Sequence, residues 1–136
     1  MIDPLGYIIT TVRDFPAVSA ITPRVRGELA EDEGPPAVVL RRLGVTRSPL
    51  GRTGRTGIQG VVIAALCFGV DSVQAAQLYG AVSDAIHQKR ARRDAQGRLI
   101  YLSLDQSGGN VSIDPDTHWP FETAVINVIA AAQAVA

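Results

Sequence analysis

The sequence predicts a single α+β domain, in which a mostly antiparallel β-sheet is flanked by an N-terminal helix and one central helix. Its 136 residues fit one domain. Two segments carry apolar residues at helical spacing, and several short apolar stretches separated by turn residues read as strands. Because no internal repeat or linker is visible, we assign residues 1–136 to one domain.

The first helix is predicted over residues 4–14. Asp3 is a capping carboxylate and Pro4 suits the first helical position. Apolar residues then recur at helical spacing as far as Val12, and Pro16 stops the helix. Residues 17–21 form either a short helical turn or an extended link.

Two strands are predicted next, over residues 24–29 and 37–43. The charged turn between them, residues 31–36, ends in Gly-Pro-Pro. Consecutive strands joined by a short turn predict an antiparallel hairpin. Residues 44–57 are rich in Gly, Arg, Ser and Thr and contain almost nothing to bury, so we expect an exposed and mobile loop.

The strongest strand is predicted over residues 58–68. Its continuous apolar run is typical of a central strand covered on both faces. Asp71 or Ser72 caps the central helix, whose apolar stripe continues to Ile86. We expect this helix to end near Arg92, because a cationic last turn suits the negative end of the helix dipole.

The remaining strands follow the central helix. We predict a strand over residues 99–104, a tight turn at 107–110 and a short segment, 111–113, that pairs back across this turn. Residues 114–120 form a loop and residues 121–131 the last strand. The final residues, 130–136, are expected to be a frayed tail.

The charges balance overall but are unevenly distributed. The 13 basic and 13 acidic side chains give zero net charge, which does not suggest long-range attraction to nucleic acid. An acidic cluster precedes a basic segment, so copies could associate head to tail and close into a ring. Solvated charged faces are the alternative explanation. The acidic residues are Glu28, Glu31, Asp32 and Glu33; the basic ones are Arg41, Arg42, Arg47, Arg52 and Arg55.

The residues do not assemble a recognisable catalytic centre. His87 and His118 are predicted in different elements, and no Gly-x-Ser-x-Gly elbow is present. The segment from Asp114 to His118 has two carboxylates and a histidine but lacks the remaining ligands of a calcium loop, so we interpret it as a turn. We therefore expect neither enzymatic activity nor a cofactor or metal.

Two features suggest contacts with other macromolecules. The Gly/Arg segment 51–57 lacks the lysine of a phosphate-binding loop. Its arginines could instead touch DNA phosphates without sequence preference or order against an acidic protein, unless the loop is merely solvated. Trp119 lies either at the edge of the core or at an interface as an anchor.

We expect a protein of the cytoplasm before assembly. Cys67, the sole cysteine, excludes an intrachain disulfide and should be a buried, inert thiol. Asp3 lies where a signal peptide would be cationic. The longest uncharged runs, 56–70 and 123–136, are too short to span a membrane.

The whole pattern resembles the tail-terminator and tail-completion proteins of long-tailed bacteriophages. The features that carry this resemblance are an N-terminal helix opening with Asp-Pro-Leu, strands around a Gly-Pro-Pro turn and a long Arg/Gly loop before the central strand. A central helix and a hairpin follow. The most specific element is the phrase from Asp114 to Pro120, Asp-Pro-Asp-Thr-His-Trp-Pro, before the closing strand.

The resemblance implies a structural protein of the virion neck. Tail terminators form hexameric rings on the last ring of the major tail tube protein, stop tube growth and present a surface to the head connector or stopper protein. The loop before the central strand faces the tube or the lumen, which here makes Arg47, Arg52 and Arg55 the expected contacts. DNA passes the inner face of the ring, and the family has no catalytic residues.

Two alternatives remain open at this point. One is another neck protein, such as a head-completion adaptor, which shares size and ring formation but binds the portal side. The other is a small cytoplasmic ligand-binding or enzymatic α+β domain. That alternative requires a pocket with convergent polar groups, for which the sequence offers no cluster.

Overall fold

The computed structural model describes residues 4–27, 34–46, 58–88, 91–93, 99–105 and 111–131, and these form the predicted α+β fold. The described strands make one mixed, mostly antiparallel sheet in the order β1-β2-β3-β7-β5-β4, with β6 paired to β7. The longest strands, β3 (Ile58–Phe68) and β7 (Pro120–Ala131), lie at the centre of the sheet. They pair with each other from Ile58 opposite Ala131 to Phe68 opposite Phe121.

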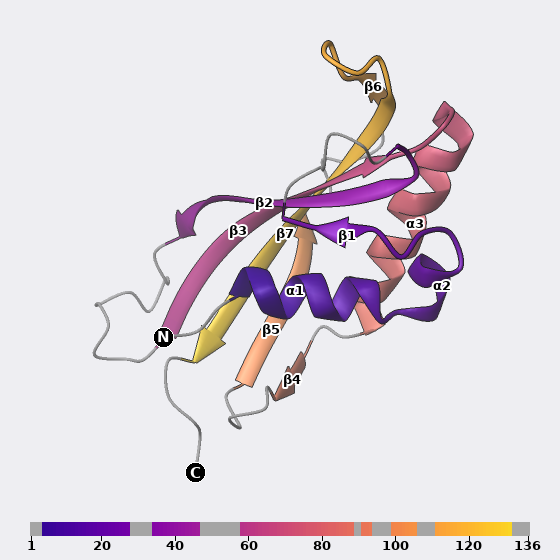
Figure 1. Ribbon diagram of the computed structural model, residues 1–136. Helices are drawn as coiled ribbons and strands as arrows, with labels where there is room; N and C mark the ends of the chain where they lie inside the picture. The colour runs from indigo at the N-terminus through magenta and orange to yellow at the C-terminus, as the bar shows by residue number, and fades with distance from the viewer. Residues whose placement is uncertain are drawn as a thin grey trace.

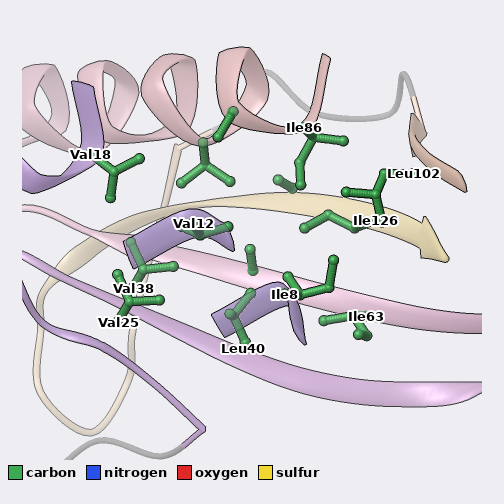
Figure 2. Close-up of a cluster of buried hydrophobic side chains, with 14 of the residues drawn as sticks. Ile8, Val12, Val18, Val25, Val38, Leu40, Ile63, Ile86, Leu102 and Ile126 are labelled. Carbon is green, nitrogen blue, oxygen red and sulfur yellow. The ribbon is translucent and has the colours of Figure 1, made fainter. Parts of the chain in front are cut away.

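All described helices lie on one face of this sheet (Figure 1). These are α1 (Pro4–Arg13), α2 (Pro16–Ser19) and α3 (Ser72–Gln88). The α1 prediction is confirmed, and α2 shows that the segment after Pro16 is a short helical turn. Figure 2 shows aliphatic side chains of the helices meeting those of the strands, including Ile8 and Val12 from α1 and Ile126 from β7. This layer is the hydrophobic core.

The junction between β3 and α3 is tightly built. The Asp71 carboxylate accepts a hydrogen bond from the Gln74 backbone N–H at 2.8 Å, which confirms Asp71 as a helix cap. The Gln74 side chain in turn accepts one from the Val70 N–H at 2.8 Å. Gly69 donates its N–H to the Pro120 carbonyl at 3.0 Å, so the junction is also tied to the start of β7.

The hairpin predicted for the first two strands is wrong. β1 (Val25–Arg26) pairs with β2 (Ala37–Thr46) in parallel, with Val25 opposite Val38. Hydrogen bonds hold the start of each strand at the same end of the sheet. Thr22 Oγ1 donates to the Pro36 carbonyl at 2.8 Å, and the Arg24 guanidinium donates to the Gly34 carbonyl at 2.6 Å. The two strands therefore begin at the same end of the sheet and run in the same direction.

β2 is longer than predicted, because Val45 and Thr46 pair with Val61 and Gly60 of β3. A β-bulge between Arg42 and Gly44 shifts the register and lets pairing continue past Gly44. Residues 44–46 of the expected loop thus belong to β2, and residues 47–57 lie outside the described part of the chain.

The central helix ends earlier than predicted, at Gln88 rather than near Arg92. Residues Ala91–Arg93 form β4, which pairs antiparallel with β5 (Leu99–Asp105). Pairing with β5 thus places Arg92 in a strand instead of the last turn of the helix.

The short strand β6 (Val111–Ile113) has a different partner from the one predicted. It pairs with the first residues of β7, with Val111 opposite Glu122 and Ile113 opposite Pro120. The turn that joins these two strands, residues 114–119, is closed by the Asp114 N–H donating to the Trp119 carbonyl at 2.9 Å. This local closure favours pairing with the strand that follows.

Candidate interaction surfaces

Most of the charged residues predicted as contacts lie outside the described residues. These are Glu28, Glu31, Asp32, Arg47, Arg52 and Arg55. Their predicted roles at the tube or at a neighbouring subunit therefore stay predictions. Trp119 lies among the described residues, as do Arg41 and Arg42 of the basic segment, which are exposed on β2.

Trp119 lies in an aromatic group at one end of the sheet. Its ring meets Phe68 edge-on, with centroids 6.0 Å apart, and Phe68 also packs against Phe121 at 5.4 Å. Trp119 is half-buried, whereas Phe68 is buried. The tryptophan thus lies at the edge of the core, and its predicted role as an interface anchor stays a prediction.

The segment from Asp114 to His118 is a turn held by its own side chains, as interpreted from the sequence. The Asp114 carboxylate accepts hydrogen bonds from the Asp116 backbone at 3.1 Å and the Thr117 hydroxyl at 2.8 Å. His118 adopts a left-handed backbone with φ 61°. Among the described residues, no group of three His, Cys, Asp or Glu side chains is arranged to hold a metal ion.

An exposed apolar patch, which we call the β6 patch, surrounds the start of α3 and the adjacent strand β6. Val73 is 63% exposed and Ile113 is 59% exposed. In the sequence, Asp71 follows Val70, and Asp114 and Asp116 follow Ile113 within three residues. The patch consists of Val70, Val73, Val111 and Ile113.

A second exposed group, which we call the distal patch, lies toward the other end of the strands. Tyr101 and Ile129 face each other on β5 and β7, and both are exposed. The distal patch consists of these two residues. Leu43, the extra residue of the β2 bulge, is 61% exposed but lies outside the patch, because β3 separates its strand from β7. Arg41 and Arg42 precede it directly and are also exposed.

A buried acidic residue lies beneath α3. Glu122 of β7 is opposite Cys67 of β3, and only 5% of its surface is exposed. Within the described part of the chain, its Oε2 atom has no hydrogen-bond partner. Burial raises the pKa of Glu122, and burial together with the nearby Glu122 carboxylate raises the pKa values of Cys67 and Tyr79.

Sequence reasoning missed both patches and the buried carboxylate. A sequence does not show where a strand extends beyond the helix that covers it. Exposed valines and isoleucines therefore look the same in the sequence as buried ones. A glutamate within a Val- and Ile-rich strand was a usable signal, because strand alternation places Glu122 on the same face as Ala124 and Ile126.

The fold and its surfaces define a small α+β domain with apolar patches at two ends. Comparison with models of known protein families found no match, and a search of curated proteins found no similar sequence. In the part of the chain described, no helix has the length and apolar character needed to cross a membrane.

Proposed function

We propose that this protein is a structural component of a phage neck, which forms a ring on the end of the tail tube, stops tube polymerisation and provides the head-attachment surface. The order of elements supports this proposal most directly. An N-terminal helix, a central strand preceded by a long segment, a central helix and a closing strand after the Asp114–Pro120 phrase are the features of the resemblance.

The distribution of exposed residues is a second source of support. Apolar groups larger than single scattered residues mark contact sites on protein surfaces. The β6 patch and the distal patch lie at different ends of the sheet, so one copy can contact two neighbours at once. A protein that binds neighbours through two different surfaces is suited to ring formation.

The proposal is tested by adding the purified protein to polymerising tail-tube protein from the same genome. Tube lengths are measured by negative-stain electron microscopy, with tube protein alone as the control. We expect shorter tubes with added density at one end. Unchanged tube lengths would contradict the proposal, and binding to portal-side proteins instead would favour the head-completion adaptor.

A further inference from the structure

The carboxylate of Glu122 is buried without the partner that such a group normally has. Only 5% of the residue is exposed, and its Oε2 atom accepts no hydrogen bond from the described residues. Within the same part of the chain, Glu122 forms no ion pair. Buried carboxylates in proteins are normally hydrogen-bonded or paired with a cation. Oε2 is therefore an acceptor to which the described residues supply no donor.

The surroundings of Glu122 come from three elements. Val111 of β6 is its cross-strand partner, so the two side chains are neighbours on the face of the sheet that carries the helices. Cys67 of β3 lies opposite Glu122 on the other side. Burial and the Glu122 carboxylate together raise the pKa of the Tyr79 phenol, which places α3 close to the carboxylate as well. None of these three neighbours is a cation.

The outer side of this arrangement is apolar and open to solvent. Val111 is 38% exposed, and Ile113, on the same face of β6, is exposed still further. Helix α3 contacts β6, and Figure 1 shows β6 at one tip of the molecule. We call the set of Tyr79, Val111, Ile113 and Glu122 the α3–β6 seam. The seam thus combines an exposed apolar rim with a recessed acid one strand further in.

A primary ammonium group on an apolar stem matches both features. An ammonium is a compact cation with three donors, so it suits a single recessed acceptor such as Oε2. The wider guanidinium fork suits a carboxylate that presents both of its oxygens. Lysine methylene groups readily pack along apolar surface. A metal ion needs several ligands, and in the described ranges no group of three His, Cys, Asp or Glu side chains could hold one.

We propose that the α3–β6 seam binds a lysine side chain presented by a partner protein, with the ammonium at Glu122 and the stem against Val111 and Ile113. The lysine supplies the donor that Oε2 lacks. A charged point within an apolar surface fixes which partner segment fits and in which register. The inference goes beyond the proposed function, because it assigns the chemistry of a contact and does not require that the partner belong to a phage neck.

Two short peptides test the seam, acetyl-Leu-Lys-Leu-amide and its counterpart with norleucine in place of lysine. Norleucine keeps an apolar stem and lacks the ammonium. Each peptide is titrated into the full-length protein at neutral pH and followed by the backbone amide signals in two-dimensional NMR. We expect the lysine peptide to shift the amide signals of Tyr79, Val111 and Glu122. It should bind at least about tenfold more tightly than the norleucine peptide, because a hydrogen bond to a charged group is lost in the latter.

Glu122→Gln keeps the shape of the side chain and removes its charge. It should weaken binding of the lysine peptide by about tenfold or more and leave binding of the norleucine peptide unchanged. Asp116→Asn removes an exposed carboxylate from the turn that joins β6 to β7 and is the matched control. It should leave the affinity for both peptides unchanged, whereas a general attraction of cations to this end of the protein would be weakened by both substitutions. Circular dichroism verifies that each variant is folded.

The pH dependence of binding separates ion pairing from apolar contact. Burial raises the pKa of Glu122, so an ammonium must displace a proton from the carboxyl at acid pH. Affinity for the lysine peptide should therefore rise as pH increases through the folded-state pKa of Glu122, and affinity for the norleucine peptide should not. Cys67 and Tyr79 have raised pKa values and stay neutral over this range, and β6 contributes no titratable group.

Four outcomes would overturn the lysine site. They are no binding of the lysine peptide to the wild type, equal binding of the two peptides, wild-type affinity in Glu122→Gln, or an affinity for the lysine peptide that does not change with pH. None of these measurements involves tail-tube protein. Failure of the lysine site therefore does not contradict tube capping, and unchanged tube lengths do not contradict the lysine site.

Discussion

Cys67 and Glu122 lie opposite each other on β3 and β7, on the sheet face that packs against the helices. Both side chains are buried, and the Glu122 Oε2 has no hydrogen-bond partner among the described residues. A charged carboxylate without full compensation is costly in the interior. This pair therefore makes the stability of the fold depend on protonation.

Glu122 should make the protein less stable as pH rises. Burial raises its pKa in the folded state above the unfolded value of about 4.3. Between these two values the folded state binds more protons, so the free energy of unfolding falls with increasing pH, by at most about 1.4 kcal/mol per pH unit from this group. Below the unfolded pKa the carboxyl is neutral in both states and the penalty is absent.

Urea denaturation at several pH values checks this expectation in wild type and Glu122→Gln. In Glu122→Gln, the decrease of the unfolding free energy with pH that comes from Glu122 should be absent. The variant should also be the more stable protein at neutral pH, because an amide stays uncharged. Asp84→Asn, at an exposed carboxylate, is the control and should keep the wild-type slope. If the unfolding free energy of Glu122→Gln fell with pH as steeply as that of the wild type, Glu122 would not be the source of this pH dependence.

Cys67 should be inert toward thiol reagents in the folded protein. It is fully buried, and burial together with Glu122 raises its pKa, so little reactive thiolate forms. Labelling with Ellman's reagent should proceed at the rate of protein opening, and adding urea should accelerate it strongly. Rapid stoichiometric labelling in native buffer would show that the β3–β7 interior is open.

Gly69→Ala should destabilise the fold by roughly 1–3 kcal/mol, the usual range for overpacking. A Cβ atom at this position would collide with the Ala75 backbone nitrogen and would lie 2.8 Å from the Asp71 carbonyl oxygen. Backbone atoms at a capped helix start cannot move aside cheaply. Thermal and urea denaturation measure the change.

Gly80→Ala is the matched control for Gly69→Ala. A Cβ at Gly80, within α3, meets nothing within 4 Å. Alanine should therefore stabilise the protein by up to about 1 kcal/mol through its higher helix propensity. Equal effects of the two substitutions would contradict the close approach at Gly69.

Thr22→Val should cost about 2 kcal/mol of stability. The buried hydroxyl donates to the Pro36 carbonyl at 2.8 Å and accepts from the Arg24 N–H at 3.0 Å. Valine keeps the shape but leaves both backbone groups without this partner. Ser19→Ala, which removes an exposed hydroxyl bond of 3.2 Å, should change stability by under about 0.5 kcal/mol. Equal losses in the two variants would argue against the role of Thr22 in holding β1 beside β2.

The amino-acid sequence by itself determined the elements whose signals are local. Apolar periodicity and capping residues predicted α1 and the start of α3, and the continuous apolar run predicted β3. The Asp114 turn was likewise predictable, because its hydrogen bonds join residues only two or three positions apart. These features depend on neighbours along the chain, which a sequence displays directly.

Only the tertiary structure decided how the elements combine. Three features were decided in this way: the parallel pairing of β1 with β2, the formation of β4 by residues 91–93, and the pairing of β6 with β7. Each depends on hydrogen bonds between different segments of the chain, and in some cases on which of two segments pairs with a given strand. The exposure of Val73 and Ile113 depends on where α3 begins relative to β6. Long-range pairing and burial are properties of the packed chain, so local residue patterns cannot specify them.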